Sequence, residues 1–499
     1  MTFISDSWFD SWFDDDDDGS SKFRVFVHFF FSPTKEKETQ SFFFLTTRIN
    51  KKSTITTNSP INSVTMSKLT NVLIIGGLIR FILPTLFPQI ITKLDSSVEF
   101  STPISSFKSL QESFYYFNHN INLYDGGINN HPPLLVILLN FINCIPGNTK
   151  FNQIWFNLFF TIVDLIITLK LIHINKWYNE YQSKRSKGKN EIKGFDDYLI
   201  ACFYLFNPLI ILTNLSHSTL IISWIFIIES ILQIIKFENI PRAMISLSIA
   251  SYLSINYLYL LPCFISFSHI IKKSSNKNYQ THQVYVEGFG IFFICSCLLI
   301  MTSFIVTASW KFLDNVYLTN IMFKNIKPNL GLWWYLFTEM FENYNLFYTI
   351  VFNLYGFIFI IPITLRLFEY SNGQGDGLLA IVLGLIWISF TKSYPILGDL
   401  GICLTMLAIF KDTVIKYCKF KYITGITLIV GLLLSPIFYY IWIVLGSGNA
   451  NFFYSISLIM GGVHILLLMD ILWTKLSIDY YDENGIDINS KDKPVLAQI

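Results

Sequence analysis

The sequence predicts an all-α polytopic membrane protein with about twelve transmembrane helices. Of its 499 residues, 52% are hydrophobic and only 14% are charged, whereas soluble domains carry about 25% charged residues. Apolar runs also recur along most of the chain, and polar or basic segments separate them. The net charge of +2 gives no reason to expect nucleic acid as a partner, since basic faces mark such proteins.

The first 65 residues differ from the rest of the chain. They contain the acidic run Asp14 to Asp18 and a Ser/Thr/Asn-rich tract, but no segment long enough to cross a bilayer. We therefore expect a disordered or mis-assigned N-terminal extension over residues 1–65. A multi-spanning membrane domain should follow over residues 66–475, and a cytosolic tail over residues 476–499.

The expected spans are the long apolar runs, because about 20 apolar residues cross a bilayer. Residues 132–174 hold two apolar segments where one crossing is expected, so we interpret residues 132–145 as a partly embedded lead-in. The twelve runs are 72–91, 132–174, 197–214, 217–236, 242–255, 256–271, 287–309, 347–367, 377–391, 394–410, 422–445 and 452–473.

The basic residues predict the orientation. Lys and Arg cluster at 176–193, at 272–277 and at 411–421, and loops rich in these residues face the cytosol. Counting spans between the three clusters gives the same side each time.

The polar features between the other span ends should then share the lumenal side. In the first of them, Phe107, Leu110, Phe114, Tyr115 and Phe117 form an amphipathic pattern, which predicts short helices along the membrane surface. The four lumenal segments are 93–131, 313–345, 392–399 and 446–451.

A short polar turn, which we call the crown, lies between the last two runs. It reads Gly-Ser-Gly-Asn-Ala-Asn-Phe-Phe-Tyr over residues 446–454. Its glycines allow a tight turn, and Asn449 and Asn451 offer amide donors and acceptors at the membrane surface. The plainer interpretation is that these asparagines only cap the next helix.

Two other lumenal stretches combine charge with aromatic or turn residues. Residues 327–348 place Glu339 and Glu342 three apart on one expected helix face, among Trp and Tyr residues typical of a bilayer interface. That composition alone fits an interfacial anchor helix. Lys392 and Asp399 flank a turn close to the membrane. Unpaired charge is unfavourable there, so we expect them to pair with each other, with a partner subunit or with a lipid head group.

No catalytic or metal centre is indicated. The seven cysteines form no CxxC pair, and none has a histidine at the spacing of a metal site or of a nucleophile and its base. We therefore expect neither a catalytic residue nor a metal or other cofactor.

Several of these segments resemble the PIG-U family, the multi-spanning subunit of GPI transamidase. The crown is similar to the family's Gly-Ser-Ala-Asn-Ser-Asn-Phe-Phe-Tyr, and residues 328–342 to its Pro-Asn-Ile-Gly-Leu-Phe-Trp-Tyr-Phe-Phe-Ala-Glu-Met-Phe-Glu. Residues 392–399 match Lys-Ser-Tyr-Pro-x-x-Gly-Asp, and residues 98–103 match Val-Glu-x-x-(Ser/Thr)-Pro. In a further similar segment, residues 124–135, the family's histidine falls at Asn130, one place before His131, so no role is assigned to that histidine.

The resemblance implies a non-catalytic, multi-pass subunit in the endoplasmic reticulum membrane. It implies as partners a caspase-like catalytic subunit, the other lumenal and membrane subunits of the complex, and the GPI glycolipid. In this interpretation Asn449 and Asn451 bind the GPI lipid. A second lumenal site or interface is expected at Asn329, Trp334, Glu339, Lys392 and Asp399.

Two other functions are weighed against this one. PIG-U-like chains distantly resemble mannosyltransferases of the same pathway, which implies a glycosyltransferase-C-like scaffold, but those enzymes use an acidic pair in the first lumenal loop. Here Asp95, Glu99 and Asp125 are scattered. An active lipid-linked mannosyltransferase is therefore the alternative, and a plain transporter is the weaker third, since few charges lie within the spans.

Overall fold

The computed structural model describes residues 60–126, 129–146, 149–185, 194–275, 281–324, 326–368 and 376–488, with residues 494 and 496. The chain divides into Met1–Ser59, which lies outside the described residues, and Pro60–Ile499, to which everything below refers. The predicted extension at 1–65 lies outside the described residues except for residues 60–65. The boundary near residue 66 stays a prediction, since the first described helix begins at Pro60.

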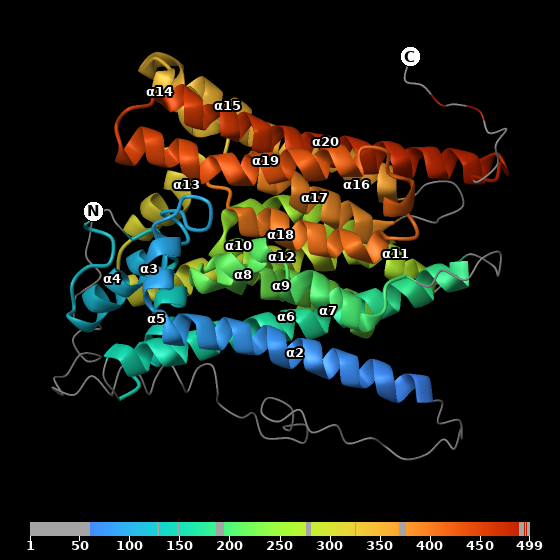
Figure 1. Cartoon of the computed structure of the whole chain (residues 1–499), viewed down its shortest axis with the longest axis horizontal. Coiled ribbons are helices and arrows are strands. Elements are labelled where there is room, and N and C mark those ends of the chain that lie inside the picture. Colours follow the sequence, from blue (N-terminus) through green and yellow to red (C-terminus); the bar gives the residue numbers. More distant parts are fainter. Residues whose placement is uncertain are drawn as a thin grey trace, which may run out of the picture. The chain divides into compact units, whose positions relative to one another are not determined.

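The described residues are helical and contain no strand (Figure 1), which confirms the predicted all-α class. Short 3₁₀ or π-helical segments lie at Ile255–Leu260, Leu313–Leu318, Ala408–Phe410, Ile415–Tyr417 and Tyr440–Val444. The α-helices are α2 (Pro60–Leu86), α3 (Gln89–Asp95), α4 (Phe107–Asn118), α5 (Pro133–Asn143), α6 (Thr149–Arg185), α7 (Asp197–Leu205), α8 (Pro208–Leu215), α9 (Leu220–Phe237), α10 (Ile240–Leu253), α11 (Leu261–Ser275), α12 (Thr281–Thr307), α13 (Thr319–Ile321), α14 (Trp333–Glu339), α15 (Glu342–Ile358), α16 (Ile360–Phe368), α17 (Gly377–Thr391), α18 (Leu397–Leu407), α19 (Lys421–Tyr439) and α20 (Ala450–Glu483).

Seven helical stretches in the described residues are long and apolar enough to cross a membrane. An eighth span is possible where α7 and α8 meet at a bend of 53°. As expected of a lead-in, α5 is a separate short helix before the long helix α6; its partial embedding in the membrane stays a prediction. The seven stretches are Ser67–Leu86, Asn152–Lys184, Leu220–Phe237, His282–Thr307, Glu342–Phe368, Lys421–Val444 and Ala450–Glu483.

The other four of the twelve expected runs form shorter helices, α10, α11, α17 and α18. A helix of 14 residues such as α10 is about 21 Å long at 1.5 Å per residue, less than the roughly 30 Å of a bilayer core. Helix α17 is buried inside the protein along nearly all of its length. A total of twelve crossings therefore stays a prediction, as does the glycosyltransferase-C-like scaffold.

The connections between helices gather at two ends of the bundle (Figure 1). Helices α3, α4, α13 and α14 and the α19–α20 turn lie at one end, which we call the polar end. The described parts of the basic clusters lie at the opposite end, which we call the basic end. There the carboxylate of Asp412 accepts a hydrogen bond from the N–H of Gly194 at 2.9 Å, and the Tyr178 hydroxyl lies 3.2 Å from the hydroxyl of Thr413. The grouping predicted from the basic clusters is therefore present; which end faces the lumen stays a prediction.

The amphipathic helix expected on the membrane surface packs on protein instead. Phe107, Leu110 and Phe114 of α4 are buried. The rings of Phe107 and Phe114 lie 5.2 and 5.9 Å from the ring of Phe156 in α6. Tyr115 remains 56% exposed. The apolar face was recognised correctly, but a neighbouring helix covers it, and a periodic pattern cannot distinguish a protein partner from lipid.

A fully buried ion pair links the first two long helices. The Nε of Arg80 in α2 lies 2.6 Å from Oδ2 of Asp164 in α6, and both side chains are 0% exposed. Tyr204 and Asn214, on the two halves of the bent pair α7–α8, donate to Asp164 at 2.9 Å each. Arg80 donates to the carbonyl of Leu205 at 2.8 Å, at the end of α7. Where the pair α7–α8 bends, this network gives the carbonyl of Leu205 a hydrogen-bond donor and the carboxylate of Asp164 a counter-charge. Buried polar groups need such partners.

Candidate functional site

The segments that were expected to share the lumenal side meet at the polar end. The N–H of Leu397 donates to the carbonyl of Glu99 at 2.9 Å. Asn329 donates to the carbonyl of Ser393 at 3.2 Å, and Ser457 of α20 donates to the carbonyl of Asn329 at 3.2 Å. Residues more than 350 positions apart in the chain are therefore held in one site by backbone and side-chain hydrogen bonds.

Asn329 is the hub of this arrangement and is 1% exposed. Its Nδ2 also donates to the carbonyl of Lys327 at 2.9 Å, and its Oδ1 accepts from the N–H of Gly331 at 2.7 Å. A Cβ on Gly331 would lie 2.9 Å from Pro395, so the turn can approach the segment before α18 only with glycine there. Asn329, which was expected at a lumenal site or interface, thus fixes the turn; its part in such a site stays a prediction.

Trp334 is buried in the protein, although it was expected at a bilayer interface. It is 1% exposed, its Nε1 donates to Ser457 Oγ at 3.3 Å, and its ring lies 5.5 Å from that of Trp442 and 5.8 Å from that of Phe453. The expectation was wrong because aromatic composition alone does not tell a packed indole from an interfacial one. Trp334 joins α14 to both helices of the α19–α20 hairpin.

Glu339 and Glu342 do not share a helix. Helix α14 ends at Glu339, the chain becomes extended at Met340 and Phe341, and α15 begins at Glu342. The prediction of one face was therefore wrong. Both acids are exposed, and Phe341 between them is 79% exposed.

Lys392 and Asp399 form an ion pair with each other, the first of the three pairings considered. Their side chains are only 5% and 7% exposed. Asp399 also accepts from the N–H of Ile396 at 3.1 Å, closing the first turn of α18. The pair therefore has a structural use, since a buried charge needs both a counter-charge and further hydrogen bonds.

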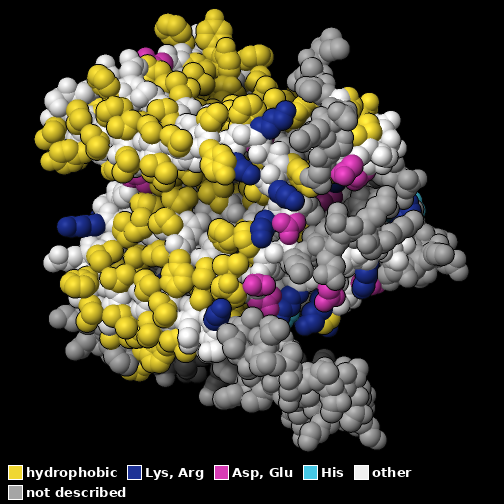
Figure 2. Space-filling view, turned by 45° about the vertical axis from the view of Figure 1, so that its right-hand side comes forward, with side chains coloured by type: hydrophobic (Ala, Val, Ile, Leu, Met, Phe, Trp, Pro, Cys, Tyr) yellow, Lys and Arg dark blue, Asp and Glu magenta, His cyan; other side chains and the backbone are white. Residues whose placement is uncertain are grey.

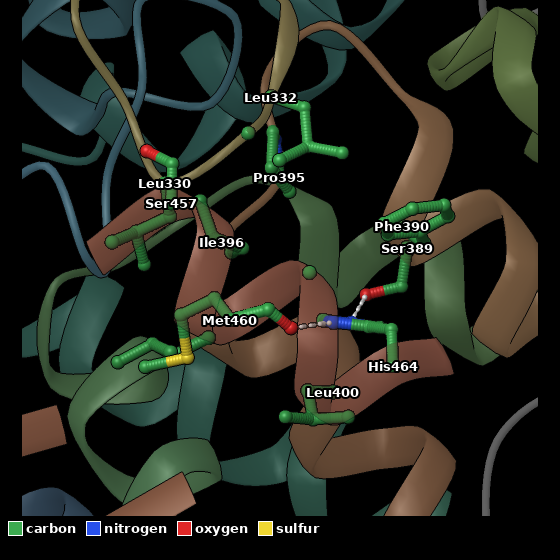
Figure 3. A pocket seen from close by; sticks show the side chains of 13 residues that line it. Leu330, Leu332, Ser389, Phe390, Pro395, Ile396, Leu400, Ser457, Met460 and His464 are labelled. Atoms are coloured by element: carbon green, nitrogen blue, oxygen red, sulfur yellow. Dashed lines mark hydrogen bonds between the residues drawn. The ribbon is translucent and has the colours of Figure 1, made fainter. Parts of the chain in front are cut away.

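A small cavity of about 20 Å³ lies beside these residues (Figure 3). It has room for about one water molecule. His464 of α20 borders it, with Nε2 3.1 Å from Ser389 Oγ and Nδ1 2.8 Å from the carbonyl of Met460. The lining residues are Leu330, Gly331, Leu332, Ser389, Phe390, Pro395, Ile396, Leu397, Leu400, Ser457, Met460, Gly461 and His464.

Asn449 and Asn451 of the crown are exposed and have defined positions, whereas Phe453 is buried. Asn449 precedes α20, and its Oδ1 accepts from the N–H of Asn451 at 3.1 Å, so it caps the helix. The hydroxyl of Tyr335 donates to Oδ1 of Asn451. Gly446 has φ +62°, which favours glycine at this turn. In the described part of the chain, neither amide NH₂ has a hydrogen-bond acceptor.

Asp95 and Asp125, the first and last acids of the first loop, already have partners. The carboxylate of Asp95 accepts from two backbone N–H groups in the first turn of α4, both at 2.9 Å, and from two serine hydroxyls at 2.6 and 3.0 Å. Asp125 lies 2.6 Å from the ammonium of Lys311. That hydrogen bond lowers the pKa of Asp125. His131, to which no role was assigned, is buried, and burial lowers its pKa to about 4, so its ring is neutral at physiological pH.

Glu99 is a site residue whose position could not be foreseen. It is 6% exposed, and its Oε1 accepts from Ser435 Oγ, four residues before the end of α19, at 2.7 Å. One of the two partners could be noticed in the sequence, because Ser435 and Pro436 interrupt the apolar run 422–445. Nothing in the sequence connects that interruption with an acid 336 residues earlier.

Comparison with known proteins identifies the family. Residues 74–460 match the family described as GPI transamidase subunit PIG-U. The chain belongs to the PIG-U family. It is 34% identical over 408 residues to the GPI transamidase component GAB1 of Saccharomyces cerevisiae, covering 82% of this chain and 94% of that protein. It is 30% identical over 386 residues to the GAB1 homolog of Schizosaccharomyces pombe (77% and 88%) and 27% identical over 420 residues to human PIGU (80% and 92%).

Four of the five segments that carry the PIG-U resemblance form one structural unit, whereas Tyr124 and Leu135 of residues 124–135 belong to the main core. Residues 98–103, 328–342 and 392–399 and the crown all contribute to the cluster around Trp334 or to the hydrogen bonds of Asn329. These four similar segments thus lie at one place in the fold rather than in separate loops.

Proposed function

We propose that this chain is a non-catalytic subunit of GPI transamidase that binds the GPI lipid and presents it for attachment to the carboxyl end of proteins in the endoplasmic reticulum. The relatives are named as components of that transamidase. The observation that carries the lipid-binding role is the crown, where two amide groups are fixed and exposed between two helices with apolar outer faces.

The geometry of the crown suits a phosphate or a sugar. The oxygens of Asn449 and Asn451 are used within the protein, so the groups left for a ligand are the NH₂ donors. Ionised phosphate oxygens accept hydrogen bonds and do not donate. Leu445 and Phe452 next to the crown are 57% and 54% exposed and would face acyl chains.

The partners follow from the family. In the proposed complex a separate caspase-like subunit cuts the preprotein, and this chain contacts the other lumenal and membrane subunits. Neither a cofactor nor a metal is proposed. The membrane of the endoplasmic reticulum, with the polar end towards the lumen, is the location that this role requires.

An Asp-Asp variant tests the lipid-binding role of the crown. N449D/N451D keeps a helix cap and keeps an acceptor for Tyr335, but it removes both donors and adds charge that repels phosphate. Each lost contact should cost about 1 to 3 kcal/mol, hence roughly tenfold or more in GPI affinity. We expect surface display of a GPI-anchored reporter to fall while partner subunits still co-purify. N449A/N451A should lose display as well.

Two controls separate binding from capping. N449S keeps the cap and leaves Asn451 unchanged but removes one NH₂ donor, so it should lose part of the display, less than the double variant; full display by N449S would favour capping alone. Y335F removes only the hydroxyl that positions Asn451 and should show a smaller loss than the double variant. Normal display by both N449D/N451D and N449A/N451A at wild-type abundance would contradict lipid binding at the crown.

The mannosyltransferase alternative requires an essential acid in the first loop. Asp95 caps α4, so its replacement would mix a folding defect with any loss of catalysis. The sharper variant is E99Q/D125N, because both changes remove charge and keep the size and an acceptor oxygen. We expect mannosylated GPI precursors to form at wild-type levels in cells that depend on it. Accumulation of mannose-deficient precursors at normal protein abundance would favour the enzyme instead.

A further inference from the structure

An exposed basic turn lies at the end of the bundle opposite the crown. Residues 416–422 read Lys-Tyr-Cys-Lys-Phe-Lys-Tyr and lead into α19. Lys416, Lys419 and Lys421 are all exposed. None of the three forms an ion pair with a carboxylate among the described residues; Lys421 donates only to two backbone carbonyls, at 3.4 and 3.5 Å. Figure 2 shows Lys and Arg side chains gathered towards this end, beside a hydrophobic face.

The nearby acidic groups already have partners. Asp470 of α20 is 6% exposed, and its two carboxylate oxygens accept from the N–H groups of Lys419 and Phe420 at 2.9 and 2.8 Å. Asp412 accepts from the N–H of Gly194, and Asp479 pairs with Lys475 at 2.9 Å. The basic turn is thus held in place through its backbone, and none of its ammonium groups pairs with a carboxylate in the described residues; those of Lys416 and Lys421 lie 5.5 and 5.6 Å from the rings of Tyr417 and Tyr422.

The apolar surroundings indicate the depth of the turn. Phe420 and Tyr422 are 48% and 75% exposed, and aromatic residues of this kind are enriched where a bilayer meets water. The outer face of α19 continues from them, since Ile426 and Leu433 are 64% and 65% exposed. Three cations therefore lie where a lipid-facing helix leaves the hydrocarbon, which is the level of the phosphate groups.

We propose that residues 416–422 bind the phosphate group of an anionic phospholipid in the leaflet at the basic end. The lysines supply charge complementary to the phosphate, and the exposed aromatic rings and α19 contact the glycerol and acyl chains. The lipid would hold the basic end of α19, whose other end carries the crown. This site is separate from the proposed GPI site and does not depend on it.

Native mass spectrometry of the full chain in detergent tests the proposal. The chain is titrated with anionic phosphatidylinositol and, separately, with zwitterionic phosphatidylcholine. A basic residue near an anionic surface contributes roughly fivefold in affinity, so K416Q/K419Q/K421Q should weaken phosphatidylinositol binding by about one hundredfold and leave phosphatidylcholine unchanged. The corresponding triple arginine variant keeps the charge and should bind like the wild type.

The matched control is K93Q/K108Q/K324Q, which removes three exposed lysines elsewhere in the chain and should leave phosphatidylinositol binding within a fewfold of the wild type. An unchanged affinity of the basic-turn variant, or an equal loss in the control, would overturn the proposal. Equally tight binding of water-soluble glycerophosphoinositol would assign the turn to free phosphate. Loss of a companion chain with unchanged lipid binding would assign it to an acidic protein segment.

Discussion

R80A should destabilise the protein by about 3 to 5 kcal/mol, because it leaves the buried carboxylate of Asp164 without its counter-charge. Both side chains are inaccessible to solvent and 2.6 Å apart. The bent pair α7–α8 depends on the same network through Tyr204 and Asn214. Chemical unfolding of the purified chain in mild detergent measures the change, and a fall in cellular abundance should accompany it.

The double variant R80M/D164L provides the decisive comparison. It removes both charges and fills the same space with apolar side chains of similar size, so the double variant should be more stable than R80A. K311A is the matched control, since its ion pair with Asp125 is 61% and 42% exposed, and exposed pairs contribute about 0 to 1 kcal/mol. Equal stability of R80A and K311A would show that the buried pair does not hold the bundle together.

W334A should cost about 3 to 5 kcal/mol, the range for truncating a large buried aromatic side chain. The indole contacts Trp442 and Phe453 of the α19–α20 hairpin, and its neighbour Tyr335 positions Asn451. We therefore expect W334A to lower both thermal stability in detergent and display of a GPI-anchored reporter. The two effects should appear together, because the space left by the missing indole would lie next to Trp442 and Phe453, which flank the crown asparagines.

Two substitutions show whether packing is the cause. W334F keeps a ring but loses the hydrogen bond to Ser457, so it should cost less than W334A. Y344A removes an aromatic side chain that is 57% exposed and should change stability by no more than about 0.5 kcal/mol. If W334A proved as stable as Y344A, the indole would not be the link between α14 and the hairpin.

The all-α class, the helical character of the apolar runs, the separation of polar from basic connections and the family could all be predicted from the amino-acid sequence. This was possible because apolar runs, basic clusters and turn residues are local patterns. The crown was recognised for the same reason: Gly446, Asn449 and Asn451 are turn and cap residues within six positions. The N-cap at Asn449 was one of the two interpretations that the local pattern allowed.

What covers each apolar surface, and which distant polar groups meet, became known from the packing of the helices alone. An apolar run has the same composition whether it is exposed on the outside of the bundle, as on α12, or buried in protein, as on α17, so the sequence could not separate candidate spans from core helices. Trp334 was likewise expected at a bilayer interface and is buried in protein, because the composition of its segment does not show what surrounds it. The pairs Arg80–Asp164 and Glu99–Ser435 join residues 84 and 336 positions apart. Such contacts follow from the packing of whole helices, because hydrogen-bond geometry acts over about 3 Å and no local pattern records which helices become neighbours.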